Sequence, residues 1–410
     1  MTRQSLIQTA KKPRDPRLDF FRGVAMFIIL VAHITDNPWT LWIPARFGFS
    51  DATEIFVFCS GMASAIAFGA IFRKAGWAIG TLRILHRMWQ VYWAHLGVFF
   101  VALLCMVALN RTGWFEADYV SALNLYPFLN STGANLIGLM TLTYVPNYFD
   151  ILPMYLVILG MVPVVMLLSR VHVLLPLAAS VTLWMYGTFG DLNFPAEYWF
   201  ANGSTRGWFF DPFCWQLIFF TGFSFMAGWL PAPPVRRDLM VLAVVIVVLT
   251  VPFAWGKVIS MSEFIREWRT DWVVLHDKTH FGILRFVHFL SIAYLAWIAV
   301  GPQGARLATP SVAAPVRVIS RVGQQSLAIF MVSMVLARLL GVVLDVIGRS
   351  FVATACVNFL GCAILIGVAY GVRYIKSEPW RVASLPAPTS VPTPTVDQPQ
   401  TGALSVKVTT

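Results

Sequence analysis

Long apolar stretches recur along the chain from Leu18 to Tyr374, and short polar segments separate them. A helix needs about 20 mainly apolar residues to cross a bilayer. The pattern therefore predicts an all-α, polytopic integral membrane protein, a helix bundle with about ten transmembrane helices. The predicted spans are 18–37, 52–72, 83–109, 151–168, 173–189, 208–230, 239–255, 282–300, 324–344 and 351–374.

Composition supports this interpretation. Hydrophobic residues make up 58% of the 410-residue chain and charged residues only 12%, which is far from the balance of a soluble domain of this size. The net charge of +11 is spread over the predicted connections, so we expect a lipid bilayer around the protein and no nucleic acid partner. The five cysteines lie inside apolar stretches without metal-ligand spacing, and no metal site is predicted.

The positive charges also predict an orientation. An even number of spans puts both termini on one side of the membrane, and that side collects most of the connecting Lys and Arg residues. By the positive-inside rule, both termini are cytoplasmic. The loops at 110–150, 190–207 and 256–281 then face outward.

Three regions follow from this reading. Residues 1–17 form a basic cytoplasmic N-terminal segment, and residues 18–375 form the transmembrane domain. Residues 376–410 are rich in Pro, Ser and Thr without helical periodicity, and we predict a disordered cytoplasmic tail.

The stretch "LDFFRGVAMFIILVAHITDNPW", which covers the first predicted span, contains the ionisable residues Asp19, Arg22 and His33. Arg22 and His33 are separated by about three helical turns and share a face, and Asp19 lies one turn before Arg22, where the two can pair. A histidine within a span faces the protein interior or a wet cavity, and its pKa suits proton transfer. Alternatively, Arg22 reaches the headgroups and His33 is a packing residue.

Two arginines begin the third span, "RILHRMWQVYWAH". Arg83 and Arg87 are four residues apart and lie on one helical face at the predicted cytoplasmic end. Two guanidinium groups can bind phosphate groups there. Ordinary positive-inside anchoring explains them equally well.

Further polar residues gather where spans begin or end on the predicted outer side. Individually, each is typical of a helix cap or a loop end, whereas together they suggest a polar chamber that opens outward. They are Asp51, Glu54, Asp150, Asp211, Arg285 and His288.

Several stretches resemble the OpgC family of membrane-bound glucan succinyltransferases, part of a wider superfamily of transmembrane acyltransferases. They are "RLDFFRGVAMFIILVAHI", "FGFSDATEIFVFCSG", "YFDILPMYLVIL", "DPFCWQLIFFTG", "LRFVHFLSIAYL" and "GQQSLAIF". Arg22 and His33 match the Arg-x10-His pattern of that superfamily. Many relatives have Asp before the histidine, where this chain has Ala32, so another acid, Glu54 or Asp51, would have to orient His33 here.

The resemblance implies that a succinyl group moves from cytoplasmic succinyl-CoA to a hydroxyl of an osmoregulated periplasmic glucan. It places the protein in a bacterial inner membrane, without a permanently bound cofactor, and with acyl-CoA and glucan as its partners. Arg22, Arg83 and Arg87 would bind CoA phosphates, the pantetheine would pass Met26 and Ile29, and His33 would act as general base.

The resemblance also implies where the substrates bind. The six outer polar residues would line the acceptor site. Arg285 would pair with the succinyl carboxylate, with Arg338 as the second candidate, unless Arg285 pairs with a loop acid such as Asp277. Tyr198, Trp199 and Trp208 are candidates for stacking on sugar rings.

Two alternative functions remain open from the sequence. One is a polysaccharide O-acetyltransferase. The other is a transporter or flippase for a polar substrate, which would predict internal repeats that the sequence does not display.

Overall fold

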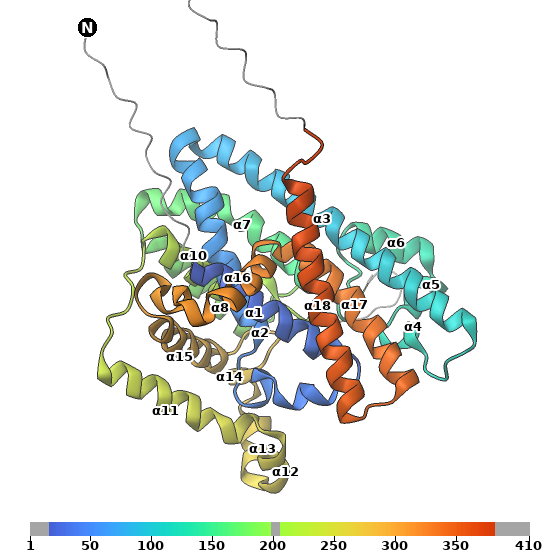
Figure 1. Ribbon diagram of the computed structural model, residues 1–410. Coiled ribbons are helices and arrows are strands. Elements are labelled where there is room, and N and C mark those ends of the chain that lie inside the picture. The colour runs from blue at the N-terminus through green and yellow to red at the C-terminus, as the bar shows by residue number, and fades with distance from the viewer. Residues whose placement is uncertain (1–15, 198–205, 382–410) are drawn as a thin grey trace, which may run out of the picture.

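A computed structural model describes residues 16–197 and 206–381, and within these ranges all regular secondary structure is helical (Figure 1). A single β-bridge joins Pro195 to Gly207. The prediction of an all-α chain is confirmed.

The helices of the first half surround the residues of interest near the start of the chain. They are α1 (Pro16–His33), η1 (Pro38–Trp42), η2 (Pro44–Arg46), α2 (Ala52–Ser64), the π-helical turn η3 (Ala65–Gly69), α3 (Ala70–Thr112), α4 (Tyr119–Ala122), α5 (Tyr126–Asn130), α6 (Thr132–Met140), α7 (Ile151–Val171) and α8 (Leu175–Gly190).

The second half is also a series of helices. They are α10 (Pro212–Ala227), α11 (Arg237–Ala254), α12 (Gly256–Met261), α13 (Glu263–Asp271), α14 (Val273–His276), α15 (Ile283–Val300), η4 (Pro302–Ala308), α16 (Pro310–Gln324), α17 (Ser326–Ile347) and α18 (Phe351–Lys376).

Each of the ten predicted spans coincides with a helix, but fewer helices have the length and composition of a span. In the described residues there are six candidates: the continuous helical run 52–112, α7, α11, α15, α17 and α18. Helices α8 and α10 have 16 residues each, fewer than the roughly 20 that a crossing requires. The structure thus supports a membrane protein with six candidate spans, and the count of ten and the orientation stay predictions.

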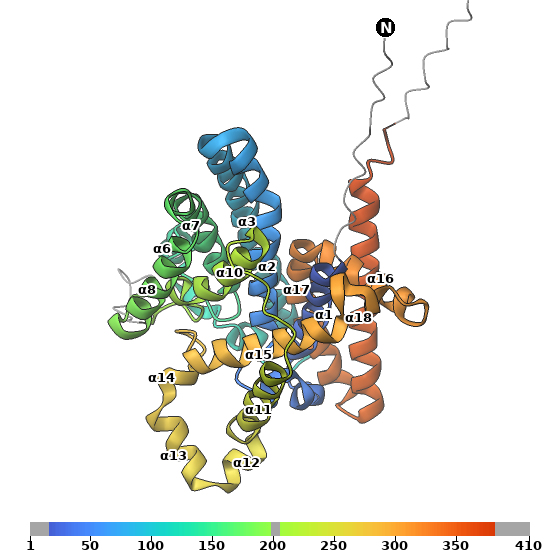
Figure 2. The same cartoon turned by 90° about the vertical axis from the view of Figure 1, so that its left-hand side faces the viewer.

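The second and third predicted spans form one helical run that turns at Gly76. This residue has φ 83° and ψ 175°, a conformation that a side chain would strain, so glycine permits the turn. In Figures 1 and 2 the start of α3 and the Lys376 end of α18 lie at the same end of the bundle, and α12 and α13 lie at the opposite end.

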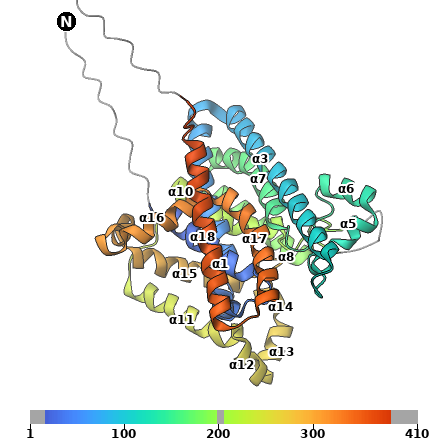
Figure 3. The same cartoon turned by 45° about the vertical axis from the view of Figure 1, so that its right-hand side comes forward.

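Helix α16 packs closely on α1, although the sequence had placed its residues in a connection. A Cβ atom added to Gly23 would lie 2.1 Å from the carbonyl oxygen of Ile319, and one added to Gly323 would lie 1.9 Å from that of Asp19. Small residues allow this backbone contact, as is common in membrane helix pairs. Helix α17 contacts α1 as well, as Figure 3 shows, so α1 is enclosed near the centre of the bundle.

Helices α2 and α10 form a second close pair. A Cβ atom on Gly61 would lie 1.9 Å from the carbonyl oxygen of Phe219, and one on Gly222 would lie 2.3 Å from that of Phe58. The phenylalanines of α10 fill the core beside this contact. The tight packing holds the second half of α2, whose first turn carries the predicted site residues Asp51 and Glu54.

Candidate functional site

Arg22 of α1 is held by residues at the junction of α16 and α17. A terminal nitrogen of Arg22 donates a hydrogen bond to the Ser326 hydroxyl, while Gln324 donates to the Asp19 carboxylate at 3.2 Å. Asp19 also acts electrostatically on Arg22, in line with the predicted pairing. The "GQQS" stretch therefore fixes the first turns of α1, a role that the sequence analysis did not assign to it.

Of Arg83 and Arg87 on α3, the structure brings Arg87 towards Arg22. The charge of Arg87 acts on Arg22, and Arg87 donates a hydrogen bond to Gln90 at 3.1 Å. Arg83 is exposed. The Nε atom of Arg22 is buried without a hydrogen-bond partner. Two neighbouring guanidinium groups with an unused donor can bind an anion such as phosphate.

Between Arg22 and His33 the same face of α1 is tightly packed. Met26 and Ile29 lie on this face and are buried within the main hydrophobic core. Side chains fill the line from Arg22 to His33, so a long substrate passing along it would have to displace them.

A backbone carbonyl group orients His33. Its Nδ1 atom lies 2.7 Å from the carbonyl oxygen of Ile29, which can only accept a hydrogen bond. Nδ1 is therefore the donor, and Nε2 carries the lone pair. Glu54 and Asp51 bond to other groups, so the expectation that one of them orients His33 is wrong; the carbonyl of Ile29 takes this role.

The imidazole of His33, the last residue of α1, is accessible. It is exposed, although the charges of Arg338, Lys278 and Asp51 act on it from three other elements. The Tyr148 ring makes an edge contact with it at a centroid distance of 5.1 Å. Such a histidine can exchange a proton with a bound molecule.

The guanidinium group of Arg338, on α17, lies over the ring of the same tyrosine. Its Cζ atom is 4.1 Å from the centroid of the Tyr148 ring, and its terminal nitrogen donates a hydrogen bond to the Thr35 hydroxyl at 3.2 Å. The Tyr148 hydroxyl in turn donates to the carbonyl oxygen of Met334 at 2.7 Å. We call His33, Tyr148 and Arg338 the His33 cluster. No role was predicted for Tyr148 from the sequence, although this residue begins one of the stretches that resemble the OpgC family.

Arg285 is already paired within the protein. Its guanidinium donates two hydrogen bonds to one oxygen of Glu54, at 2.6 and 2.8 Å, and lies 3.7 Å from Asp51. Lys278 pairs with Asp51 at 2.6 Å. We call these four residues the paired cluster. Pairing of Arg285 with Asp277 is not observed, because Asp277 bonds to His280 instead.

The start of α2 is itself built by this cluster. Asp51 caps the helix through the amide of Thr53, and Glu54 accepts the amide of Asp51 at 2.7 Å, which completes a capping box. Asp51 and Glu54, which were predicted to line a substrate chamber, therefore bond to backbone amides and to the cations of the paired cluster.

His288 lies beside the paired cluster. Its Nδ1 atom accepts a hydrogen bond from the Ser50 amide at 3.2 Å, so its Nε2 atom carries the proton. A Cβ atom on Gly48 would lie 2.1 Å from the ring, so glycine is required there. His288 is buried, which leaves the imidazole little room to contact a substrate.

Asp150 and Asp211 also stabilise the protein backbone. The Phe209 amide donates to Asp150 at 3.2 Å, and Asp211 caps α10 through the Phe213 amide at 2.8 Å. Trp208 is buried and donates to the carbonyl oxygen of Pro195, so it has no free face for a sugar. Tyr198 and Trp199 lie outside the described residues.

The segment Asp277–Gly282 precedes α15 and is hydrogen-bonded to α8 and α10. Its carbonyl oxygens at Lys278 and Phe281 accept hydrogen bonds from Trp215 and Trp184. Within it, the hydrogen bond from His280 to Asp277, 2.9 Å long, raises the pKa of His280 above its usual value. Burial favours the neutral acid, but the bonds from His280 lower the pKa of Asp277 overall.

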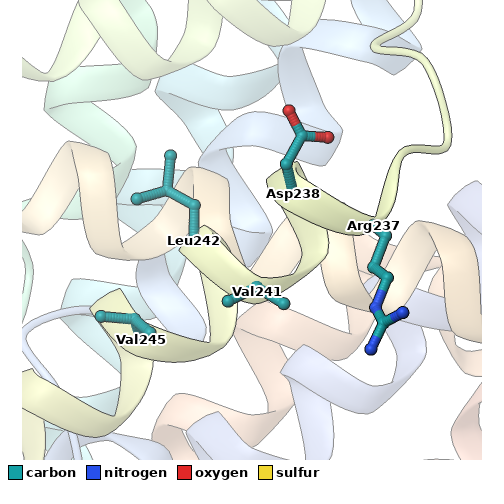
Figure 4. Close-up of a pocket in the computed structure, with 5 residues that line it drawn as sticks. All are labelled: Arg237, Asp238, Val241, Leu242 and Val245. Carbon is teal, nitrogen blue, oxygen red and sulfur yellow. The ribbon is translucent and has the colours of Figure 1, made fainter.

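One surface hollow contains none of these residues. Figure 4 shows it on the largely exposed helix α11, where Arg237, Asp238 and three apolar side chains line it. Lipid-facing surface accounts for such a hollow, and Asp238 there bonds to Arg236. In the part of the chain that the structure describes, no group of three His, Cys, Asp or Glu residues could hold a metal ion.

Comparison with known families shows which family the chain belongs to. The family model described as OpgC protein matches residues 14–377, most of the sequence. The chain belongs to the OpgC family. No curated protein and no solved structure matches it. For this OpgC family member, membership indicates a membrane-bound glucan acyltransferase, and the helices long enough to cross a bilayer agree with that.

Proposed function

We propose that the protein transfers a short acyl group, with succinyl as the expected one, from cytoplasmic acyl-CoA to a hydroxyl of a periplasmic glucan. The reaction takes place in a bacterial inner membrane. The observation that carries the proposal is the state of His33: Nδ1 is bound to a carbonyl group, and Nε2 is free in an accessible space.

In the proposed mechanism, His33 is the general base. Its Nε2 atom takes the proton of the glucan hydroxyl as that oxygen attacks the thioester carbonyl carbon. The C–O ester bond forms, the C–S bond breaks, and the departing CoA thiolate takes the proton back from His33. Because the carbonyl group of Ile29 fixes the tautomer, the Nε2 atom carries the lone pair that accepts the proton.

The donor binds through its phosphates. Arg22 and Arg87 supply two positive charges to one site, and Arg83 provides a further charge nearby on α3. The pantetheine then runs towards His33, and Met26 and Ile29 move aside to admit it. Binding energy from the CoA part compensates for this rearrangement.

The acceptor reaches His33 from the opposite side. The ion pair of Lys278 and Asp51 lies within electrostatic range of His33.

Identification of the product tests this function. Purified protein is incubated with glucan and with succinyl-CoA or acetyl-CoA, and the glucan is analysed by mass spectrometry. We expect succinyl esters on the glucan and free CoA in equal amount. Ester formation from acetyl-CoA alone would support an O-acetyltransferase. Glucan that crosses vesicle membranes unmodified, without CoA release, would instead establish a transporter.

A further inference from the structure

The charge of Arg338 has no anionic partner in the described part of the chain. Its terminal nitrogen donates a hydrogen bond to the neutral Thr35 hydroxyl, and its Nε atom is buried without a partner. A guanidinium group has five N–H donors, so most of its capacity is unused. Contact with the Tyr148 ring at 4.1 Å compensates only in part, since such a contact contributes about 0.5–2 kcal/mol.

An unpaired cation inside a membrane protein is costly and normally has an anionic partner. The other arginine of this region, Arg285, shows the usual solution, because Glu54 and Asp51 both neutralise it. The contrast between the two arginines indicates that the partner of Arg338 is a group from outside the chain.

The position of Arg338 specifies which molecule provides this anion. His33 and Arg338 contact the same Tyr148 ring, at 5.1 and 4.1 Å, so these two distances limit the separation of imidazole and guanidinium. An extended four-carbon acyl chain spans about 4 Å. An acyl group whose carbonyl carbon reacts beside His33 can therefore reach Arg338 with its far end.

We propose that Arg338 binds the free carboxylate of a dicarboxylic acyl group during transfer and so selects acyl donors with a negatively charged end. This inference rests on the proposed function, since it requires an acyl group at His33. Tyr148 is the positioning residue: its hydroxyl is bound to the Met334 carbonyl, and its ring holds the guanidinium in place.

The test compares two donors of equal length. Succinyl-CoA has a carboxylate at the end of its four-carbon acyl group, and butyryl-CoA has a methyl group there. In Arg338→Gln the neutral amide loses the ion pair, and kcat/KM for succinyl-CoA should fall on the order of 10²-fold. The kcat/KM for butyryl-CoA should stay within about threefold, because a methyl group has no charge to lose.

Two further variants complete the design. Arg338→Lys keeps the charge but loses the planar donor geometry, so it should retain a reduced preference for succinyl-CoA. It also decides the question if Arg338→Gln does not fold. Arg349→Gln is the matched control: this arginine follows α17 and bonds to Asp345, and its loss should affect both donors equally little.

The outcomes separate the inference from the function. Equal losses for both donors in the Arg338 variants, with an active wild type, would overturn the role of Arg338 and leave the proposed function standing. A wild type that prefers butyryl-CoA would do the same. A wild type that transfers no acyl group from any acyl-CoA would overturn the proposed function.

Discussion

Two neighbouring polar clusters differ in whether their charges are satisfied. In the paired cluster, Arg285 and Lys278 bond to Glu54 and Asp51, and the same acids cap α2. In the His33 cluster, Arg338 has no carboxylate partner among the residues that the structure describes, and the imidazole of His33 is exposed. Satisfied charges fix a fold, whereas unsatisfied charges beside an accessible space are suited to bind a substrate.

The largest expected effect breaks the paired cluster. Arg285→Gln leaves Glu54 buried without its cation, and such losses typically destabilise a protein by about 3–5 kcal/mol. The melting temperature in detergent should fall markedly, and Glu54→Gln in the same chain should restore part of it, because it removes the unpaired charge. An unchanged melting temperature in Arg285→Gln would contradict the structural role of this pair.

A smaller effect is expected at Arg87 of α3, whose charge acts on Arg22. A charge-assisted hydrogen bond contributes about 1.5–3 kcal/mol, so Arg87→Ala should raise the Kd for acyl-CoA roughly 10–100-fold. The loss should be larger at low salt than at high salt. Calorimetric titration measures both values.

Arg83→Ala is the matched control for Arg87, since Arg83 is exposed on the same helix. We expect it to weaken binding less than Arg87→Ala. Equal and negligible effects of both substitutions would leave these arginines as anchors for topology only.

The smallest effect concerns pH and the segment Asp277–Gly282. Because the pKa of His280 is raised by Asp277, the pair stabilises the fold below the unfolded-state pKa of about 6.5, and this contribution is lost as pH rises through the folded-state pKa. His280→Ala should thus cost about 0.5–1 kcal/mol near pH 5.5 and little near pH 8.5. Thermal melts at both pH values measure it, and a larger cost at the higher pH would refute the pairing.

Local patterns in the sequence were enough to predict the helices and the shared face of Arg22 and His33. Both depend on residues close in the chain, where helical periodicity fixes the geometry. The lengths of α8 and α10 and the packing of α16 could not be predicted from local patterns. Tertiary contacts, such as that of Gly323 with the backbone of Asp19, determine how helices of this kind lie.

The partners of the site residues could not be derived from sequence. Arg285 and Glu54 are 231 positions apart, and Arg22 and Ser326 are 304 positions apart. Only the fold shows that Arg285 is neutralised while Arg338 is not. The one available signal for Tyr148 and Ser326 was that both lie in stretches similar to the OpgC family.

The most direct test of this contrast is the rate of acyl transfer per folded molecule in His33→Ala and Arg285→Gln, measured together with their melting temperatures. The account predicts that His33→Ala melts like wild type and loses about 10²–10⁴ in rate, as expected when a general base is removed. Arg285→Gln should melt earlier and keep most of its rate per folded molecule. A well-folded His33→Ala protein with near-normal transfer would contradict the assignment of His33 as the catalytic base.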